Sequence, residues 1–94
     1  MTAQQIADEL EAFIRSQFMV SNADRSFDRT VDLFDGGYVD SIGLAELLAF
    51  IEDRFAVEIP EEDLFSARFA SIEGMADIIA DHASDTPSAE TTGT

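Results

Sequence analysis

The chain has no cysteine and no lysine, and only one histidine among its 94 residues. Without cysteine, the protein forms neither a disulfide nor a thiolate metal site. Five arginines face twenty acidic residues, so the net charge is -15. Such a charge repels the phosphates of nucleic acids. We therefore expect no nucleic-acid partner, and we expect partner proteins that present basic patches.

Long apolar runs are also missing. No stretch of about 18 apolar residues is present, so no membrane span is predicted. The first five residues lack the basic segment that opens a secretory signal. These features favour the cytoplasm as the location. The length predicts one small domain, and eight Phe among 46% hydrophobic residues provide for a compact core.

The residues for catalysis are scarce. A serine hydrolase needs a serine, a base and an orienting acid that converge. The single histidine, His82, lies near the end of a predicted helix, where a positive charge complements the helix dipole. The acidic segments do not match the ligand spacing of a calcium loop. We therefore expect no enzyme activity and no metal site.

Apolar periodicity predicts an all-α fold, a small four-helix bundle of three main helices and one short helix with a long first loop. Thr2 and Gln5 match a capping box that begins the first helix. The predicted helices cover residues 3–19, 41–55, 61–65 and 72–83, with the loop over 20–40. A folded domain over residues 1–83 would then precede a disordered tail over 84–94, which is rich in Ser, Thr and Pro.

The second predicted helix has two distinct faces. Asp40 is a favourable N-cap residue, so the helix should begin at Ser41. On a helical wheel, one apolar stripe of this helix faces the core and contains Leu44, Leu47, Leu48, Ile51 and Phe55. Ile42 lies on the opposite side beside Glu46, Ala49 and Asp53. An exposed isoleucine among acids predicts a docking contact for a partner.

Ser41 is the residue with the clearest chemical role. The loop Leu33-Phe34-Asp35-Gly36-Gly37-Tyr38-Val39 leads into Asp40-Ser41-Ile42 at the predicted helix start. The unpaired N–H groups and the dipole at that end of a helix favour an anion. A phosphodiester attached to the Ser41 hydroxyl would therefore be stabilised there.

Over roughly residues 3 to 83, the chain resembles the acyl carrier proteins, discrete members of the phosphopantetheine-dependent carrier superfamily. The resemblance rests on Asp40-Ser41-Ile42, on the helix from Leu44 to Phe55, on Val57-Glu58-Ile59-Pro60 with the acids that follow, and on Ser71-Ile72. It implies that Ser41 receives 4′-phosphopantetheine from coenzyme A through a Mg²⁺-dependent phosphopantetheinyl transferase. The thiol of the arm then holds cargo as a thioester.

The resemblance also implies partners and the residues that contact them. Asp40 is the flanking signature residue, and the partner-binding surface consists of Ile42, Glu46, Asp53, Glu61 and Glu62. The partners are the transferase, a ligase or transacylase that loads the cargo, and a synthase or acyltransferase with a basic docking patch. The carrier itself is expected to be a monomer.

Two positions differ from the pattern of bacterial fatty-acid carriers. Gly43 stands where an acid is usual, and Ala49 where a larger apolar residue is frequent. Both changes thin the docking face, which favours polyketide, antibiotic or other secondary metabolism over fatty-acid synthesis. An aminoacyl or peptidyl carrier loaded by an adenylating ligase, and an unmodified acidic interaction module, remain as alternatives.

Overall fold

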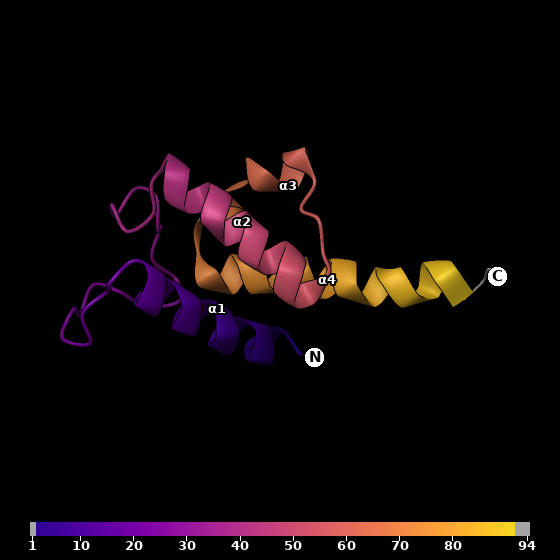
Figure 1. The fold of residues 1–94 in the computed structure, drawn as a ribbon, viewed down its shortest axis with the longest axis horizontal. Coiled ribbons are helices and arrows are strands. Elements are labelled where there is room, and N and C mark those ends of the chain that lie inside the picture. Colours follow the sequence, from indigo (N-terminus) through magenta and orange to yellow (C-terminus); the bar gives the residue numbers. More distant parts are fainter. Residues whose placement is uncertain (1, 92–94) are drawn as a thin grey trace.

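The computed structural model describes residues 2–91, with side chains described for residues 2–83. Its elements are α1 (Ala3–Gln17), α2 (Ser41–Phe55), α3 (Glu61–Leu64), the 3-10 turn η1 (Ala67–Ala70) and α4 (Ile72–Thr91). Figure 1 shows α4 along the long axis, with α1 on one side, α3 on the other and α2 crossing obliquely between them. The predicted all-α bundle with a long first loop is confirmed.

The predicted capping box begins α1. The Thr2 Oγ1 accepts a hydrogen bond from the Gln5 N–H at 3.1 Å, and the Gln5 Oε1 accepts one from the Thr2 N–H at 2.8 Å. The buried face of α1 carries Ile6, Leu10 and Ile14, and this helix packs on α4. Local capping and apolar spacing thus agree on where α1 lies.

The first helix ends earlier than residue 19, where the sequence predicted its end. Met19 adopts the left-handed conformation with φ 57°. The Val20 N–H donates to the Arg15 carbonyl at 3.0 Å and the Phe18 N–H to the Ile14 carbonyl at 2.9 Å. These bonds satisfy carbonyls in the last turn and stop the helix at Gln17.

The final helix begins as predicted and ends later. The Ser71 hydroxyl accepts a hydrogen bond from the Gly74 N–H at 3.1 Å, and the inward residues Ile72, Met75, Ala76 and Ile79 are all buried. The backbone continues as helix to Thr91, past the predicted end at residue 83. Apolar periodicity reports where a helix packs and not where its backbone ends. The predicted tail over 84–94 lies in part outside the described residues, and its disorder stays a prediction.

The connection between α2 and α4 holds an element that the sequence did not predict. The short helix α3 ends at Leu64, one residue before the expected end, and η1 follows it. Phe69 of η1 is buried, and the Ala70 carbonyl accepts a hydrogen bond from the Leu33 N–H at 2.8 Å. A four-residue turn is too short to show helical periodicity, so only packing and long-range hydrogen bonding define it.

One hydrophobic core joins the helices and the loop. Its buried members outside the α1 and α4 faces already named are Phe27, Leu33, Val39, Leu47, Ile51, Val57, Phe69 and Ile78, with Ala7. In α2, Leu47 and Ile51 of the predicted stripe are buried, while Leu44, Leu48 and Phe55 are partly buried and pack against the core. Because Phe27 and Leu33 are buried, apolar side chains of the long loop hold it against the bundle.

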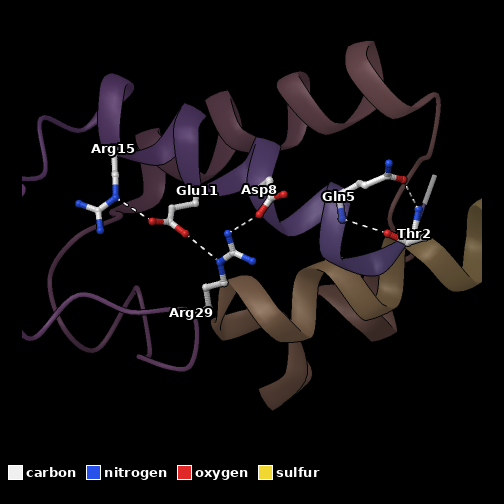
Figure 2. A network of polar contacts seen from close by, with 6 residues as sticks. All are labelled: Thr2, Gln5, Asp8, Glu11, Arg15 and Arg29. Atoms are coloured by element: carbon white, nitrogen blue, oxygen red, sulfur yellow. Dashed lines mark hydrogen bonds and ion pairs between the residues drawn. The ribbon is translucent and has the colours of Figure 1, made fainter.

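An arginine also holds the long loop. The guanidinium of Arg29 donates from Nε to Glu11 at 2.8 Å and from Nη2 to Asp8 at 2.5 Å, and Arg15 donates to the other oxygen of Glu11 at 2.9 Å (Figure 2). The Arg29 carbonyl accepts a hydrogen bond from the Glu73 N–H at the start of α4. Arg29 therefore ties the loop to α1 and α4 together.

The start of α2 packs closely against the end of α1. A Cβ at Gly43 would lie 2.7 Å from Cε1 of Phe18 and 3.2 Å from Oδ1 of Asp40. Gly43 is buried, so the Phe18 ring rests directly on the first turn of α2. A larger side chain at residue 43 would therefore require the Phe18 ring to move.

Replacement of Arg29 by alanine should destabilise the fold. We expect a loss of about 1 kcal/mol, which lowers the Tm by about 4–8 °C in a domain of this size. Thermal unfolding of Arg29→Ala is compared with Arg25→Ala, because Arg25 is exposed in the same loop. Equal Tm values for the two variants would contradict the anchoring role.

The effect of Arg29→Ala should also depend on pH. The hydrogen bonds from Arg29 and then Arg15 hold the pKa of Glu11 below its ordinary value of 4.5. A carboxyl whose folded pKa is lowered stabilises the fold above its unfolded pKa and loses this contribution as pH falls through the folded value. The Tm difference between wild type and Arg29→Ala should be full above pH 4.5 and shrink in more acidic buffer.

A double-mutant cycle tests the contact between Gly43 and Phe18. Alanine favours a helix over glycine by about 1 kcal/mol, but its Cβ at residue 43 displaces the Phe18 ring. In a Phe18→Ala background that conflict is gone. Gly43→Ala should therefore be more favourable by about 1 kcal/mol in that background, measured by denaturant unfolding. The same change in both backgrounds would show that the ring does not press on Gly43.

Candidate functional site

Ser41 is the first residue of α2, and its side chain is exposed. Asp40 is the N-cap, with Oδ1 accepting a hydrogen bond from the Gly43 N–H at 2.8 Å. The Leu44 N–H donates to the Asp40 carbonyl at 2.8 Å and begins the helical ladder. The N–H groups of Ser41 and Ile42 precede that ladder, at the positive end of the helix dipole.

The loop before Ser41 has a defined shape. The N–H groups of Tyr38 and Val39 both donate to the Leu33 carbonyl, at 2.9 and 3.0 Å, and Gly37 has φ 81°. Both Leu33 and Val39 are buried. Because these two anchors lie in the core, the chain emerges at Asp40 in a fixed direction and presents Ser41 outward.

A tyrosine reinforces the same loop. The Tyr38 hydroxyl donates to Asp24 at 2.8 Å, and its ring meets that of Phe27 edge to face at 5.1 Å. The hydrogen bond to Asp24 raises the pKa of Tyr38. The two halves of the loop are thereby joined close to where it delivers Ser41.

The predicted outer face of α2 is exposed. Ile42 is 73% exposed, and Glu46, Ala49 and Asp53 are exposed as well. At 100° per residue these four positions lie within one narrow sector of the helix. Gly43 does not belong to this face, because it lies under Phe18. The interpretation that Gly43 thins the docking face is therefore wrong, and that of Ala49 agrees with its position.

Glu61 and Glu62 lie on a different helix from the other predicted contact residues. Both are exposed at the start of α3, and with Pro60 and Phe65 they border a surface depression. Phe65 is 80% exposed. The expectation that the eight Phe residues provide for the core is therefore wrong for Phe65. Its place after Leu64 at the end of a four-residue helix gave no periodicity to reveal its exposure.

Two aromatic side chains line a groove at the surface, whereas the neighbouring Leu47 lies in the core. Leu47 is fully buried and fills the core. The rings of Phe13 and Phe50 stack at 4.1 Å and line an open groove between α1 and α2. Glu46, Ala49 and Asp53 of the exposed α2 face also line this α1–α2 groove.

The histidine has a different role from the predicted one. His82 Nε2 lies 2.9 Å from Oδ2 of Asp63, which joins α4 to α3. The helix continues past His82 to Thr91, so the residue does not face a helix end and the predicted dipole contact is wrong.

Over the part of the chain with described side chains, no three His, Asp or Glu residues are arranged to hold a metal ion. Among the described helices, none is long and apolar enough to span a bilayer. The arrangement at Ser41 instead suits a covalently attached anion. Its hydroxyl is open to an approaching enzyme, and the adjacent N–H groups favour a phosphodiester.

The family comparison agrees with this geometry. A family model described as the phosphopantetheine attachment site matches residues 5–79. No curated protein and no solved structure matches the chain. The match covers most of α1, the loop, Ser41 with the rest of α2, α3, and the first part of α4. The chain therefore belongs to the phosphopantetheine-binding carrier family, whose members carry 4′-phosphopantetheine as a covalent cofactor.

Proposed function

We propose that the protein is a free-standing acyl carrier that holds acyl intermediates as thioesters on a 4′-phosphopantetheine arm at Ser41. The observation that carries this proposal is the exposed Ser41 hydroxyl at a helix start capped by Asp40. The arm supplies a thiol, which a chain without cysteine does not have. The protein presents cargo to enzymes of polyketide or other secondary metabolism in the cytoplasm, and it catalyses nothing alone.

The residues around Ser41 have separate tasks. The Asp40 side chain accepts a hydrogen bond from the Gly43 N–H, so the first turn of α2 stays formed whether or not Ser41 is modified. The N–H groups at the helix start favour the phosphodiester. With neither lysine nor cysteine in the chain, no side-chain amine or thiol attacks the thioester. The domain thus supports the arm and leaves its cargo intact.

Partner binding is proposed for Ile42, Glu46 and Asp53 on α2, extended by Glu61 and Glu62 on α3. Their support is exposure and charge: all five are exposed on a chain of net charge -15. Long-range attraction speeds the encounter with a basic patch, while few strong contacts permit rapid release. Such a surface suits a monomer that visits a transferase, a loading enzyme and a synthase in turn.

The alternatives differ in how the carrier is loaded. An aminoacyl or peptidyl carrier would receive its cargo from an adenylating ligase, and an acyl carrier of synthase type from a transacylase. Loading assays with one enzyme of each kind separate them. An unmodified acidic interaction module would bind its partner equally well after Ser41→Ala.

Attachment at Ser41 is tested by intact mass. With coenzyme A, Mg²⁺ and a broad-specificity phosphopantetheinyl transferase, the wild-type chain should gain one phosphopantetheine that maps to Ser41. Ser41→Ala should retain the helical circular dichroism spectrum, because Asp40 still caps α2. It should gain no phosphopantetheine, because it lacks the hydroxyl group. Ser16→Ala, at an exposed serine of α1, is the control and should be modified normally. Modification of Ser41→Ala would refute the site.

The docking surface is tested by transferase kinetics. The variant Glu46→Gln/Asp53→Asn should lower kcat/KM on the order of two- to tenfold at low salt, since each change weakens attraction to a basic patch. The difference in kcat/KM between wild type and this variant should become smaller at 0.5 M NaCl, where charges are screened. Asp77→Asn, an exposed acid of α4, should have little effect. An equal loss in both variants would assign the effect to net charge rather than to this face.

A further inference from the structure

The α1–α2 groove carries an inference about the cargo. It is lined by Phe13 and Gln17 of α1, by Glu46, Ala49, Phe50, Glu52 and Asp53 of α2, and by Ala56, Val57 and Glu58 after it. The stacked rings of Phe13 and Phe50 provide an apolar floor. Ala49 is exposed on the α2 side, and its methyl group leaves the groove open where a longer side chain would occupy it.

The charge of the groove has one sign. Glu46, Glu52, Asp53 and Glu58 are exposed carboxylates, and the lining residues with described side chains include no Lys, Arg or His. The neighbouring Arg54 is directed to Glu9, with Nη2 donating to Oε2 at 2.7 Å. A ligand that combines an apolar body with a positive charge therefore complements this groove better than a neutral or anionic one.

The attachment site is within reach of the groove. Along α2, at about 1.5 Å per residue, Glu46 lies about 7.5 Å and Asp53 about 18 Å from Ser41. The arm has about 14 bonds from the serine oxygen to sulfur and extends to about 17 Å at the usual advance per bond. Its thiol end therefore reaches the part of the groove between Ala49 and Asp53.

Tethering explains why a shallow groove is sufficient. An open groove holds a free small molecule weakly, because little of the ligand surface is buried. A ligand on a short flexible tether has an effective concentration in the millimolar range, so weak contacts still fill the groove for part of the time. Weak contacts also release the cargo to an enzyme.

We propose that the α1–α2 groove receives aminoacyl cargo, with the ammonium group toward Asp53 and the apolar side chain over Ala49 and the Phe13–Phe50 stack. This inference rests on the proposed attachment at Ser41, and it favours the aminoacyl alternative over simple acyl intermediates as the cargo of that site. It separates the cargo by charge, since a simple acyl chain has no group to pair with the carboxylates.

The test uses two arms that differ in a single amine. The transferase loads Ser41 from a coenzyme A analogue whose arm ends in an amide of either leucine or 4-methylpentanoate, which is leucine without its amine. The phosphopantetheine part is transferred to the serine oxygen, and adenosine 3′,5′-bisphosphate leaves. Intact mass first establishes attachment. Proton–nitrogen NMR spectra are then compared with the unloaded holo protein at low salt and at 0.5 M NaCl.

The expected result is a shift of the amide signals of Ala49, Phe50 and Asp53 that is about two- to fivefold larger with the leucyl arm, the range of one exposed ion pair. At 0.5 M NaCl the amide shifts produced by the two arms should become similar, because salt screens the ion pair. Ala49→Leu fills the groove and should abolish the shifts. Ala45→Leu, the same change at an exposed alanine of α2 outside the groove lining, should preserve them.

Three outcomes would overturn the inference. Loaded chains whose groove amides do not move would show that the cargo does not bind there. Equal or larger shifts with 4-methylpentanoate would show that the amine is not recognised. If Ala49→Leu weakens transferase binding and leaves the amide shifts of the loaded chain unchanged, the groove binds a protein and not the cargo. A chain that gains no mass would instead refute the attachment at Ser41, and the inference with it.

Discussion

The chain has five arginines and twenty acidic residues, and the ion pairs of these arginines affect both the stability of the fold and the charge of its surface. Four of the arginines form ion pairs within the fold. Arg15 pairs with Glu11, Arg29 with Asp8 and Glu11, Arg54 with Glu9, and Arg68 with Asp81. Arg29 connects the loop to α1 through its side chain and to α4 through its carbonyl. Because these cations are engaged internally, the outer face of α2 keeps its negative charge. Arg29 thus anchors the long loop, and no arginine lies among the exposed residues Ile42, Glu46, Ala49 and Asp53 of α2.

The start of α2 shows how packing and chemistry share one turn of helix. Phe18 covers Gly43 on the inner side, while Ser41 and Ile42 remain exposed on the outer side. Asp40 satisfies the Gly43 N–H from the solvent side. The geometry of the turn is therefore held by Phe18 and Asp40, and the serine is not required for it. The proposed attachment at Ser41 needs this separation, since that residue must change chemically without changing the fold.

The surface features of the molecule suit brief contacts. The α1–α2 groove is open, Ile42 and Phe65 are isolated exposed apolar residues, and the other residues of the proposed docking surface are carboxylates. Exposed carboxylates contribute little lasting affinity, but they raise association rates toward basic partners. A domain that must pass cargo between enzymes benefits from fast encounter and fast release. The same weakness makes the tether necessary for any cargo that rests on the groove.

The sequence alone determined the helical class, the bounds of α2, the caps formed by Thr2, Asp40 and Ser71, and Ser41 as the candidate attachment residue. These features depend on neighbours within about four residues, which capping rules and apolar spacing describe. Only the tertiary structure decided that Phe18 covers Gly43, that Arg29 reaches Asp8 and Glu11, that η1 exists and that Phe65 is exposed. Each of these depends on residues far apart in the chain, or on an element too short to show a period. Local hydrogen bonds can be predicted from neighbouring residues in the sequence, whereas long-range contacts depend on how the helices pack.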